Sequence, residues 1–166
     1  MSTKTENETT PETRIEADPA VPVIRIVREF DAPPERVFRA FTDPDVFVQW
    51  LGPDSTSVRL DKWDAVNGGS YRYTMLRGSE ELVTFWGSFH AVRSPDLLVQ
   101  TQSMEGAGDE AVLNTLTFEA LPDGRTRLTD TTLTDSFEVR DMILSSGLDE
   151  GVIAGYQKLD DLLAKD

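Results

Sequence analysis

Residues 147–163, GLDEGVIAGYQKLDDLL, decide the fold of this chain. Five apolar positions recur there at spacings of four, four, three and four, which is the period of one face of an α-helix. These positions are Leu148, Val152, Tyr156, Leu159 and Leu163. Upstream, Asp135 or Ser136 can cap a further helical turn before Gly147 interrupts the pattern. The sequence therefore predicts a long amphipathic C-terminal helix whose apolar stripe has to be buried against a large partner.

Three glycines of this region, Gly147, Gly151 and Gly155, recur at every fourth residue and would share one helix face. A glycine inside a helix costs about 1 kcal/mol relative to alanine, so three of them need a reason. Close packing of the helix on its partner is one reason, and a strip left open beside a ligand cavity is the other. The sequence leaves both open.

The partner is predicted to be a sheet. A β-branched run at residues 23–30 indicates a first strand, and six more short β-rich runs follow, separated by turn residues such as Gly, Pro, Asn and Asp. Between the first strand and the others, Pro33 and Pro34 can start one short helix, and Asp43 with Pro44 can cap and start another. We expect the six later strands at residues 57–63, 69–76, 82–92, 97–104, 112–119 and 126–133.

This order, β-α-α-β6-α, defines an α+β fold in which a curved seven-stranded antiparallel sheet wraps around the long C-terminal helix. The domain is expected to cover residues 23–166. Residues 1–22 are rich in Thr, Glu and Pro and contain five acidic and two basic residues, so we expect a disordered acidic leader. The leader has neither a basic start nor an apolar centre, which argues against a secretory signal, and the expected location is the cytoplasm.

Composition excludes several classes of function. With 16 Lys and Arg against 30 Asp and Glu, the net charge is −14, which disfavours nucleic acid and anionic membranes as partners. The leader accounts for 2 − 5 = −3 of this charge, and the domain carries −14 − (−3) = −11. There is no cysteine and only one histidine, so no disulfide, thiolate nucleophile or paired-imidazole metal site can form, and we expect neither metal nor cofactor.

Aromatic residues supply the candidate binding site. A sheet that curls around one helix often encloses a void, and aromatic walls with a few polar groups suit an apolar ligand. Strand alternation does not decide which face of residues 82–92 lines such a cavity. The candidate lining residues are Trp50, Trp63, Tyr71, Tyr73, Trp86, Phe89, His90, Met104 and Tyr156.

Two titratable residues are also candidates. His90 has the only side chain with an ordinary pKa near neutrality, and a hairpin at Ser94-Pro95-Asp96 would place it opposite Gln100, so it is the candidate acid–base group. A structural, hydrogen-bonded histidine is the alternative. Asp130 either faces inward, where its carboxylate would need a partner such as Arg72, or lies on the surface, and the surface placement is favoured.

Several short motifs, taken together in order, resemble one known family. They are Phe30-Asp31-Ala32-Pro33, Phe41-Thr42-Asp43-Pro44, Trp50, Gly68-Gly69, Gly87, Ser94-Pro95, Thr126-Arg127-Leu128-Thr129 and Gly147-Leu148-Asp149-Glu150-Gly151. The chain is similar to the activator-of-heat-shock-ATPase-like branch of the START-like (SRPBCC, helix-grip) superfamily, and Gly87-Ser88-Phe89-His90 looks like the stand-alone bacterial members. The resemblance implies a helix-grip fold with a cavity between sheet and last helix, in a superfamily that binds lipids, polyketides and other apolar molecules.

Three functions follow as expectations. The first is binding of a small apolar or aromatic molecule without catalysis. The alternatives are a cyclase- or hydratase-type enzyme that uses His90 as acid and base, and a co-chaperone or interaction module. The eukaryotic chaperone activators of the resembled family carry an additional N-terminal domain that 22 polar residues do not replace, so chaperone activation is not expected. A homodimer through sheet edges or helices stays open.

Overall fold

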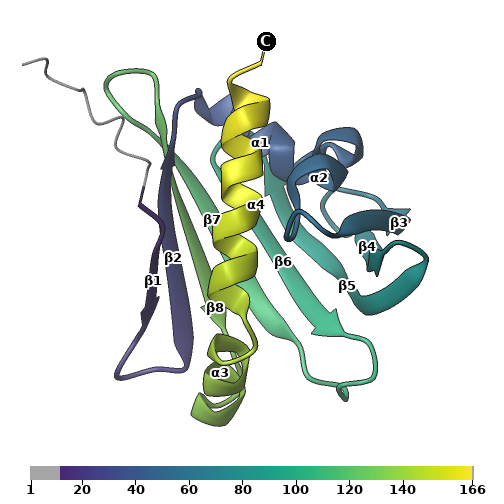
Figure 1. Ribbon diagram of the computed structural model, residues 1–166. Helices are drawn as coiled ribbons and strands as arrows, with labels where there is room; N and C mark the ends of the chain where they lie inside the picture. Colours follow the sequence, from purple (N-terminus) through teal and green to yellow (C-terminus); the bar gives the residue numbers. More distant parts are fainter. Residues whose placement is uncertain (1–11, 166) are drawn as a thin grey trace, which may run out of the picture.

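The computed structural model describes residues 12–165, which fold into one antiparallel sheet and four helices. The sheet has eight strands in the order β1-β2-β8-β7-β6-β5-β4-β3, and the last helix lies across its concave face (Figure 1). The strands are β1 (Arg14–Ala17), β2 (Val23–Phe30), β3 (Ser57–Trp63), β4 (Ser70–Arg77), β5 (Glu80–Arg93), β6 (Leu97–Met104), β7 (Val112–Ala120) and β8 (Thr126–Leu133). The helices are α1 (Pro34–Thr42), α2 (Pro44–Trp50), α3 (Phe137–Leu144) and α4 (Leu148–Leu163).

The α+β helix-grip architecture is confirmed, but the prediction of seven strands is wrong by one. The additional strand, β1, comes from the segment predicted as a leader and pairs antiparallel with β2, with Ile15 opposite Ile26. Ile15 packs against the core, while Arg14 and Glu16 are exposed and place charges on the sheet edge. Charged side chains on an edge strand discourage pairing with a further strand, so a polar segment is suited to form the edge of the sheet. The prediction for residues 1–11 lies outside the described residues.

The C-terminal helical region consists of two helices instead of one interrupted helix. The Ser136 side chain accepts a hydrogen bond from the Val139 amide and so caps α3. Gly147 then takes a left-handed conformation, with φ of 87°, and α4 begins at the next residue. Because this conformation strains any residue with a side chain, Gly147 sets the direction in which α4 crosses the sheet.

The two other glycines of the C-terminal region differ in their surroundings. A Cβ at Gly155 would lie 3.2 Å from the Trp50 carbonyl oxygen, so this glycine permits close contact between α4 and the end of α2. A Cβ at Gly151 would meet no atom within 4 Å. Close packing therefore explains Gly155, backbone conformation explains Gly147, and Gly151 faces open space.

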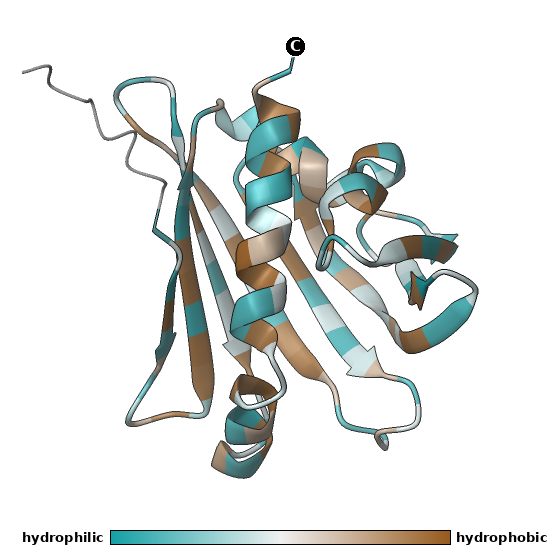
Figure 2. Ribbon diagram, in the orientation of Figure 1, coloured by the Kyte–Doolittle hydropathy of each residue, from teal (hydrophilic) through white to brown (hydrophobic). Residues whose placement is uncertain are grey.

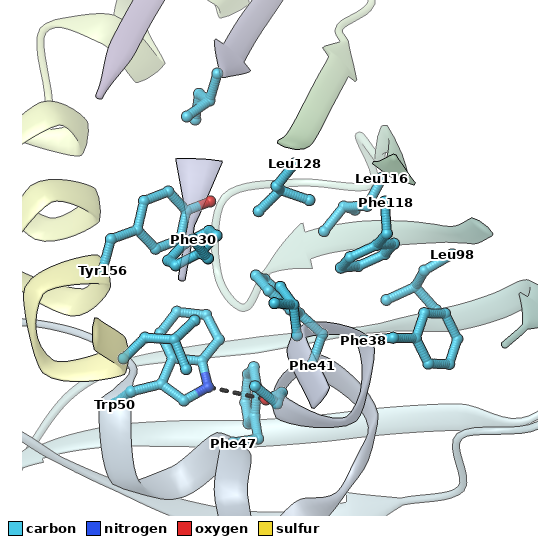
Figure 3. Packing of buried hydrophobic residues seen from close by; sticks show 14 of the residues in the cluster. Phe30, Phe38, Phe41, Phe47, Trp50, Leu98, Leu116, Phe118, Leu128 and Tyr156 are labelled. Atoms are coloured by element: carbon cyan, nitrogen blue, oxygen red, sulfur yellow. Dashed lines mark hydrogen bonds between the residues drawn. The ribbon is translucent and has the colours of Figure 1, made fainter. Parts of the chain in front are cut away.

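The apolar core lies between the sheet and helices α1, α2 and α4. Apolar and polar residues alternate along the strands (Figure 2), and the buried members of the strands are mainly apolar. Figure 3 shows Trp50 donating its indole N–H to the Ala40 carbonyl oxygen at 2.8 Å, with Tyr156 and Phe30 beside it. No helix within residues 12–165 is long and apolar enough to cross a membrane.

Candidate functional site

The space between α4 and the sheet has two halves of different chemistry. At the end where β2 finishes and α1 begins, large side chains fill it completely, and Phe30, Leu128 and Leu159 have no exposed surface. The ring centroids of Phe30 and Tyr156 lie 5.3 Å apart, and those of Trp50 and Tyr156 lie 6.0 Å apart. This half is a well-packed aromatic core.

The other half lies toward α3, where β8 ends and β6 ends (Figure 1). There the inward face of the sheet becomes polar: Asn114 pairs in register with Gln100 on one side and Thr132 on the other. Asp130 pairs with the buried Ile26 and Leu116, which places it on the same inward face. We call this surface the polar wall, and it consists of Gln100, Gln102, Asn114, Asp130 and Thr132.

Hydrogen bonds connect three members of the polar wall but leave acceptors free. Asn114 donates from Nδ2 to Thr132 Oγ1 at 2.8 Å, and Thr132 Oγ1 lies 3.4 Å from Asp130 Oδ1. Asn114 is 7% exposed, and its Oδ1 has no hydrogen-bond partner within the described residues. A buried polar atom without a partner costs about 1–3 kcal/mol, so the unpaired oxygen requires an explanation.

Asp130 forms no ion pair within residues 12–165. Burial raises its pKa to about 7, and the hydrogen bond from Thr132 offsets this only in part. Arg28 of β2, a fully buried cation, is bound to Asp160 of α4: its Nη1 donates to Asp160 Oδ1 at 2.7 Å and its Nη2 donates to Oδ2 of the same carboxylate, while its Nε has no hydrogen-bond partner within the described residues. Burial also raises the pKa of the Tyr156 hydroxyl, and the Asp130 charge contributes to that rise.

The favoured surface placement of Asp130 is therefore wrong. Arg72, the partner considered for a buried Asp130, lies on the opposite side of the sheet and pairs with Asp61 and Glu105. Sequence reasoning also missed Asn114, although it alternates with the inward-facing Leu116 and Phe118 and could have been found from that period.

The cover over the polar wall is apolar and incompletely buried. Ile143 and Leu144 of α3 and Leu148 and Val152 of α4 pack against the core only as half-buried residues. No residue of α3 is fully buried. The backbone of α4 packs against α1, α2 and α3. Open space at Gly151 lies on this same helix, one turn before Gly155.

Most predicted aromatic lining residues lie in the interior, and three of them, Trp50, Trp63 and Tyr71, have their polar atoms bound to backbone carbonyl groups. Trp63 Nε1 donates to the Thr42 carbonyl at 2.9 Å, and the Tyr71 hydroxyl donates to the Thr101 carbonyl at 2.6 Å. Burial raises the pKa of both Tyr71 and Tyr73. The interior members of the predicted set are Trp50, Tyr71, Tyr73, Phe89 and Tyr156, all buried, and Trp63, half-buried. Their main role in this structure is to fill the core.

The other predicted residues do not line the interior. Trp86 is 47% exposed and shares the outer face of β5 with His90, which is exposed as well. A β-bulge between Phe89 and Ala91 makes Phe89, and not His90, the residue opposite Gln100. Met104, 44% exposed, lies at the end of β6 opposite Phe85. Trp86 and His90 are thus wrong as walls of an interior site, and Met104 lies at its rim.

Metal binding and other hollows offer no competing site in the described part of the chain. Residues 12–165 contain no group of three or more His, Asp or Glu side chains that could hold a metal ion. A surface hollow of about 80 Å³ lies between Asp31, Asp160, Leu163 and Ala164. Asp31 and Asp160 are already paired with Arg125 and Arg28, so this hollow has no free charged group.

The fold and the partly polar interior between sheet and α4 define an α+β helix-grip protein. More specifically, the chain belongs to the family described as Activator of Hsp90 ATPase homolog 1-like protein, whose profile matches residues 31–164. No curated protein matches the sequence.

Solved structures share the fold. The chain is similar to protein Ms6760 from Mycobacterium smegmatis, with 23% identity, a TM-score of 0.83 and coverage of 95% of this chain and 99% of that one. It is also similar to protein CV1439 from Chromobacterium violaceum, with 26% identity, a TM-score of 0.74 and coverage of 87% and 99%. PFC0360w, an HSP90 activator from Plasmodium falciparum, shares the fold at 18% identity, with a TM-score of 0.55 and coverage of 78% and 89%.

Proposed function

We propose that this protein binds a small, mainly apolar molecule that carries a hydrogen-bond donor, between the polar wall and helices α3 and α4. One observation carries the proposal: Asn114 keeps an unpaired amide oxygen in an almost fully buried position. Natural proteins rarely retain such an atom, and binding sites are among the places where they do. The ligand donor would satisfy the oxygen that the protein leaves free.

The surroundings of the site fit this ligand class. Apolar side chains from α3 and α4 would contact the body of the molecule, and the polar wall would orient its polar end. The family supports a binding or interaction module in general, whereas the ligand class is inferred from these side chains alone. An enzyme that uses His90 loses its support, because His90 lies on the outer face of the sheet, away from the proposed site.

The test is a fluorescence titration with N-phenylnaphthylamine, an apolar probe that carries one N–H donor. Val152 faces the core from α4 and Ile153, the next residue, is exposed, so the two positions provide a matched pair. Val152→Trp should place a large ring where the body of the probe would lie, between α4 and the polar wall, and weaken probe binding at least tenfold. Ile153→Trp should leave the affinity unchanged.

A thermal melt adds an independent readout, since a ligand at about 100 times its dissociation constant stabilises the fold by about 2.7 kcal/mol. This stabilisation should appear in the native chain and in Ile153→Trp, and should be absent from Val152→Trp. Failure of the probe to bind the native chain, or equal binding by both variants, would refute the proposed site.

A second candidate function, an interaction module, is favoured by the exposed apolar residues of α3. Phe137 and Met142 are 43% and 59% exposed, and the helix also carries Glu138 and Asp141. The net charge of −14 favours a basic amphipathic segment of another protein over a second copy of this acidic chain as the partner. A lysine- and leucine-rich helical peptide should bind the native chain and fail to bind a Phe137→Ser, Met142→Ser variant. Concentration-dependent dimerisation in light scattering would contradict this choice of partner.

A further inference from the structure

We infer that the ligand of the interior site carries a protonated nitrogen, which binds between the Asp130 carboxylate and the Asn114 amide oxygen. This inference rests on the proposed function and adds the chemical class of the polar group. The expected ligand is an amine with an aromatic or aliphatic body.

The first argument is that Asn114 and Asp130 both present acceptor oxygens on the polar wall. Asn114 donates its amide N–H to Thr132, and its Oδ1 has no hydrogen-bond partner within the described residues. Thr132 Oγ1 lies within 2.8 Å of the Asn114 nitrogen and 3.4 Å of Asp130 Oδ1, so one hydroxyl group joins the two side chains. This hydroxyl group links the Asn114 amide to the Asp130 carboxyl, and an ammonium group, which has several N–H donors and no acceptor, would bind to the oxygens of both side chains.

The second argument is charge. The residues that pair with Asp130 across the sheet, Ile26 of β2 and Leu116 of β7, are apolar. The titratable groups close to it are Tyr156 of α4, which also interacts with Arg28, and Arg28 of β2, which pairs with Leu128 one inward position along β8. Arg28 is bound through two nitrogens to Asp160 of α4, and the Tyr156 phenol is neutral at physiological pH, with its pKa raised further by burial. A cationic ligand would thus supply the counterion that Asp130 lacks.

The third argument is the field of the whole molecule. A chain with a net charge of −14 attracts cations and repels anions at long range. A ligand carboxylate or phosphate would also meet Asp130 inside the site, where like charges repel strongly. The net negative charge of the protein therefore favours the approach of an ammonium group over that of an anionic group, and the Asp130 carboxyl favours it within the site.

The test compares three probes that share one phenethyl body: phenethylamine, phenethyl alcohol and hydrocinnamate, which are cationic, neutral and anionic near neutral pH. Each is titrated into the full-length protein by calorimetry and by displacement of N-phenylnaphthylamine. The amine should bind at least tenfold more tightly than the alcohol, and hydrocinnamate should bind most weakly. Asp130→Asn should lower the amine affinity at least tenfold and leave the alcohol affinity within about twofold.

The pH dependence separates a charge effect from loss of shape. The carboxyl of Asp130 has a pKa of about 7, whereas an alkylamine stays protonated below about pH 9. Amine affinity should therefore rise about tenfold from about pH 5 to 6 and level off above about pH 7, while alcohol affinity stays flat. The Asp130→Asn variant should show no such rise.

The outcomes distinguish this inference from the proposed function. If amine and alcohol displace the fluorescent probe with equal affinity, the ammonium inference is wrong and the apolar site stands. If amine preference persists in Asp130→Asn, the inference is wrong as well. If none of the three molecules binds and N-phenylnaphthylamine does not bind either, both proposals fail.

Discussion

Replacing Asn114 by leucine should stabilise the protein while removing its response to ligand. The two side chains have similar size, so the exchange changes hydrogen bonding more than packing. It removes the buried Oδ1 that has no partner and deletes the 2.8 Å hydrogen bond from Nδ2 to Thr132. Thr132 can still donate to Asp130, which lies within 3.4 Å.

The magnitude follows from these two changes. Relief of an unsatisfied buried acceptor contributes about 1–3 kcal/mol, and loss of one neutral hydrogen bond costs about 1 kcal/mol. Added apolar surface contributes about 1 kcal/mol more. We therefore expect the free energy of unfolding to rise by about 1–3 kcal/mol and the Tm to rise by roughly 2–12 °C for a chain of this size.

Urea denaturation and calorimetry of the free protein measure this change, and Asn67→Leu is the matched control. Asn67 has its Oδ1 occupied by the Val92 amide at 2.6 Å, so the same substitution there should lower stability by about 1 kcal/mol. If Asn114→Leu instead destabilises the free protein by more than about 1 kcal/mol, the Asn114 oxygen serves the free fold. The central argument for a ligand would then be refuted.

Three further predictions concern charge and packing. The raised pKa of Asp130 lies above the 3.8 of an unfolded aspartate, so the contribution of this group to stability should fall as the pH rises from about 4 to about 7, by up to about 4 kcal/mol. Urea denaturation at several pH values measures this slope, which Asp130→Asn should abolish. Gly155→Ala should lower the Tm because its Cβ would press on the Trp50 carbonyl oxygen. Gly151→Ala, whose Cβ meets open space, should raise stability by about 1 kcal/mol. Equal effects of the two substitutions would contradict the packing described. Asp160→Ala should cost about 3–5 kcal/mol by leaving the fully buried Arg28 without a counterion, and a loss below about 1 kcal/mol would show that this charge reaches water.

Local signals in the sequence were sufficient for most of the fold. The bounds of β2, β3, β6 and β8 match the predicted runs, because Gly, Pro, Asn and Asp residues terminate each strand. Asp43 caps α2 through a hydrogen bond from the Asp45 amide, as its position before Pro44 predicts. Features of this kind depend on a few neighbouring residues and on no distant contact.

Features that depend on distant contacts could not be predicted in this way. The strand β1 has a single apolar inward residue, Ile15, and exists because β2 offers an unpaired edge. His90 was misplaced because a bulge after Phe89 inserts one residue into β5, and a shift of one residue moves a side chain to the other face of a sheet. Bulges of this kind leave no clear mark in the composition of a strand.

The same reasoning explains why the aromatic residues suggested a site and the polar wall did not. Trp50, Trp63 and Tyr71 bind backbone carbonyl groups of α1, the end of that helix and β6, so their polar atoms hold the core together and are not free for a ligand. No sequence motif marks Asn114 or Asp130, and only the pairing of β7 with β8 brings both side chains to the Thr132 hydroxyl group. An aromatic residue is inexpensive to bury, whereas an unpaired amide oxygen and an unpaired carboxylate both reduce stability. Residues that lower stability in the free fold are therefore better indicators of a binding site here than residues that raise it, because selection for folding alone would have replaced them.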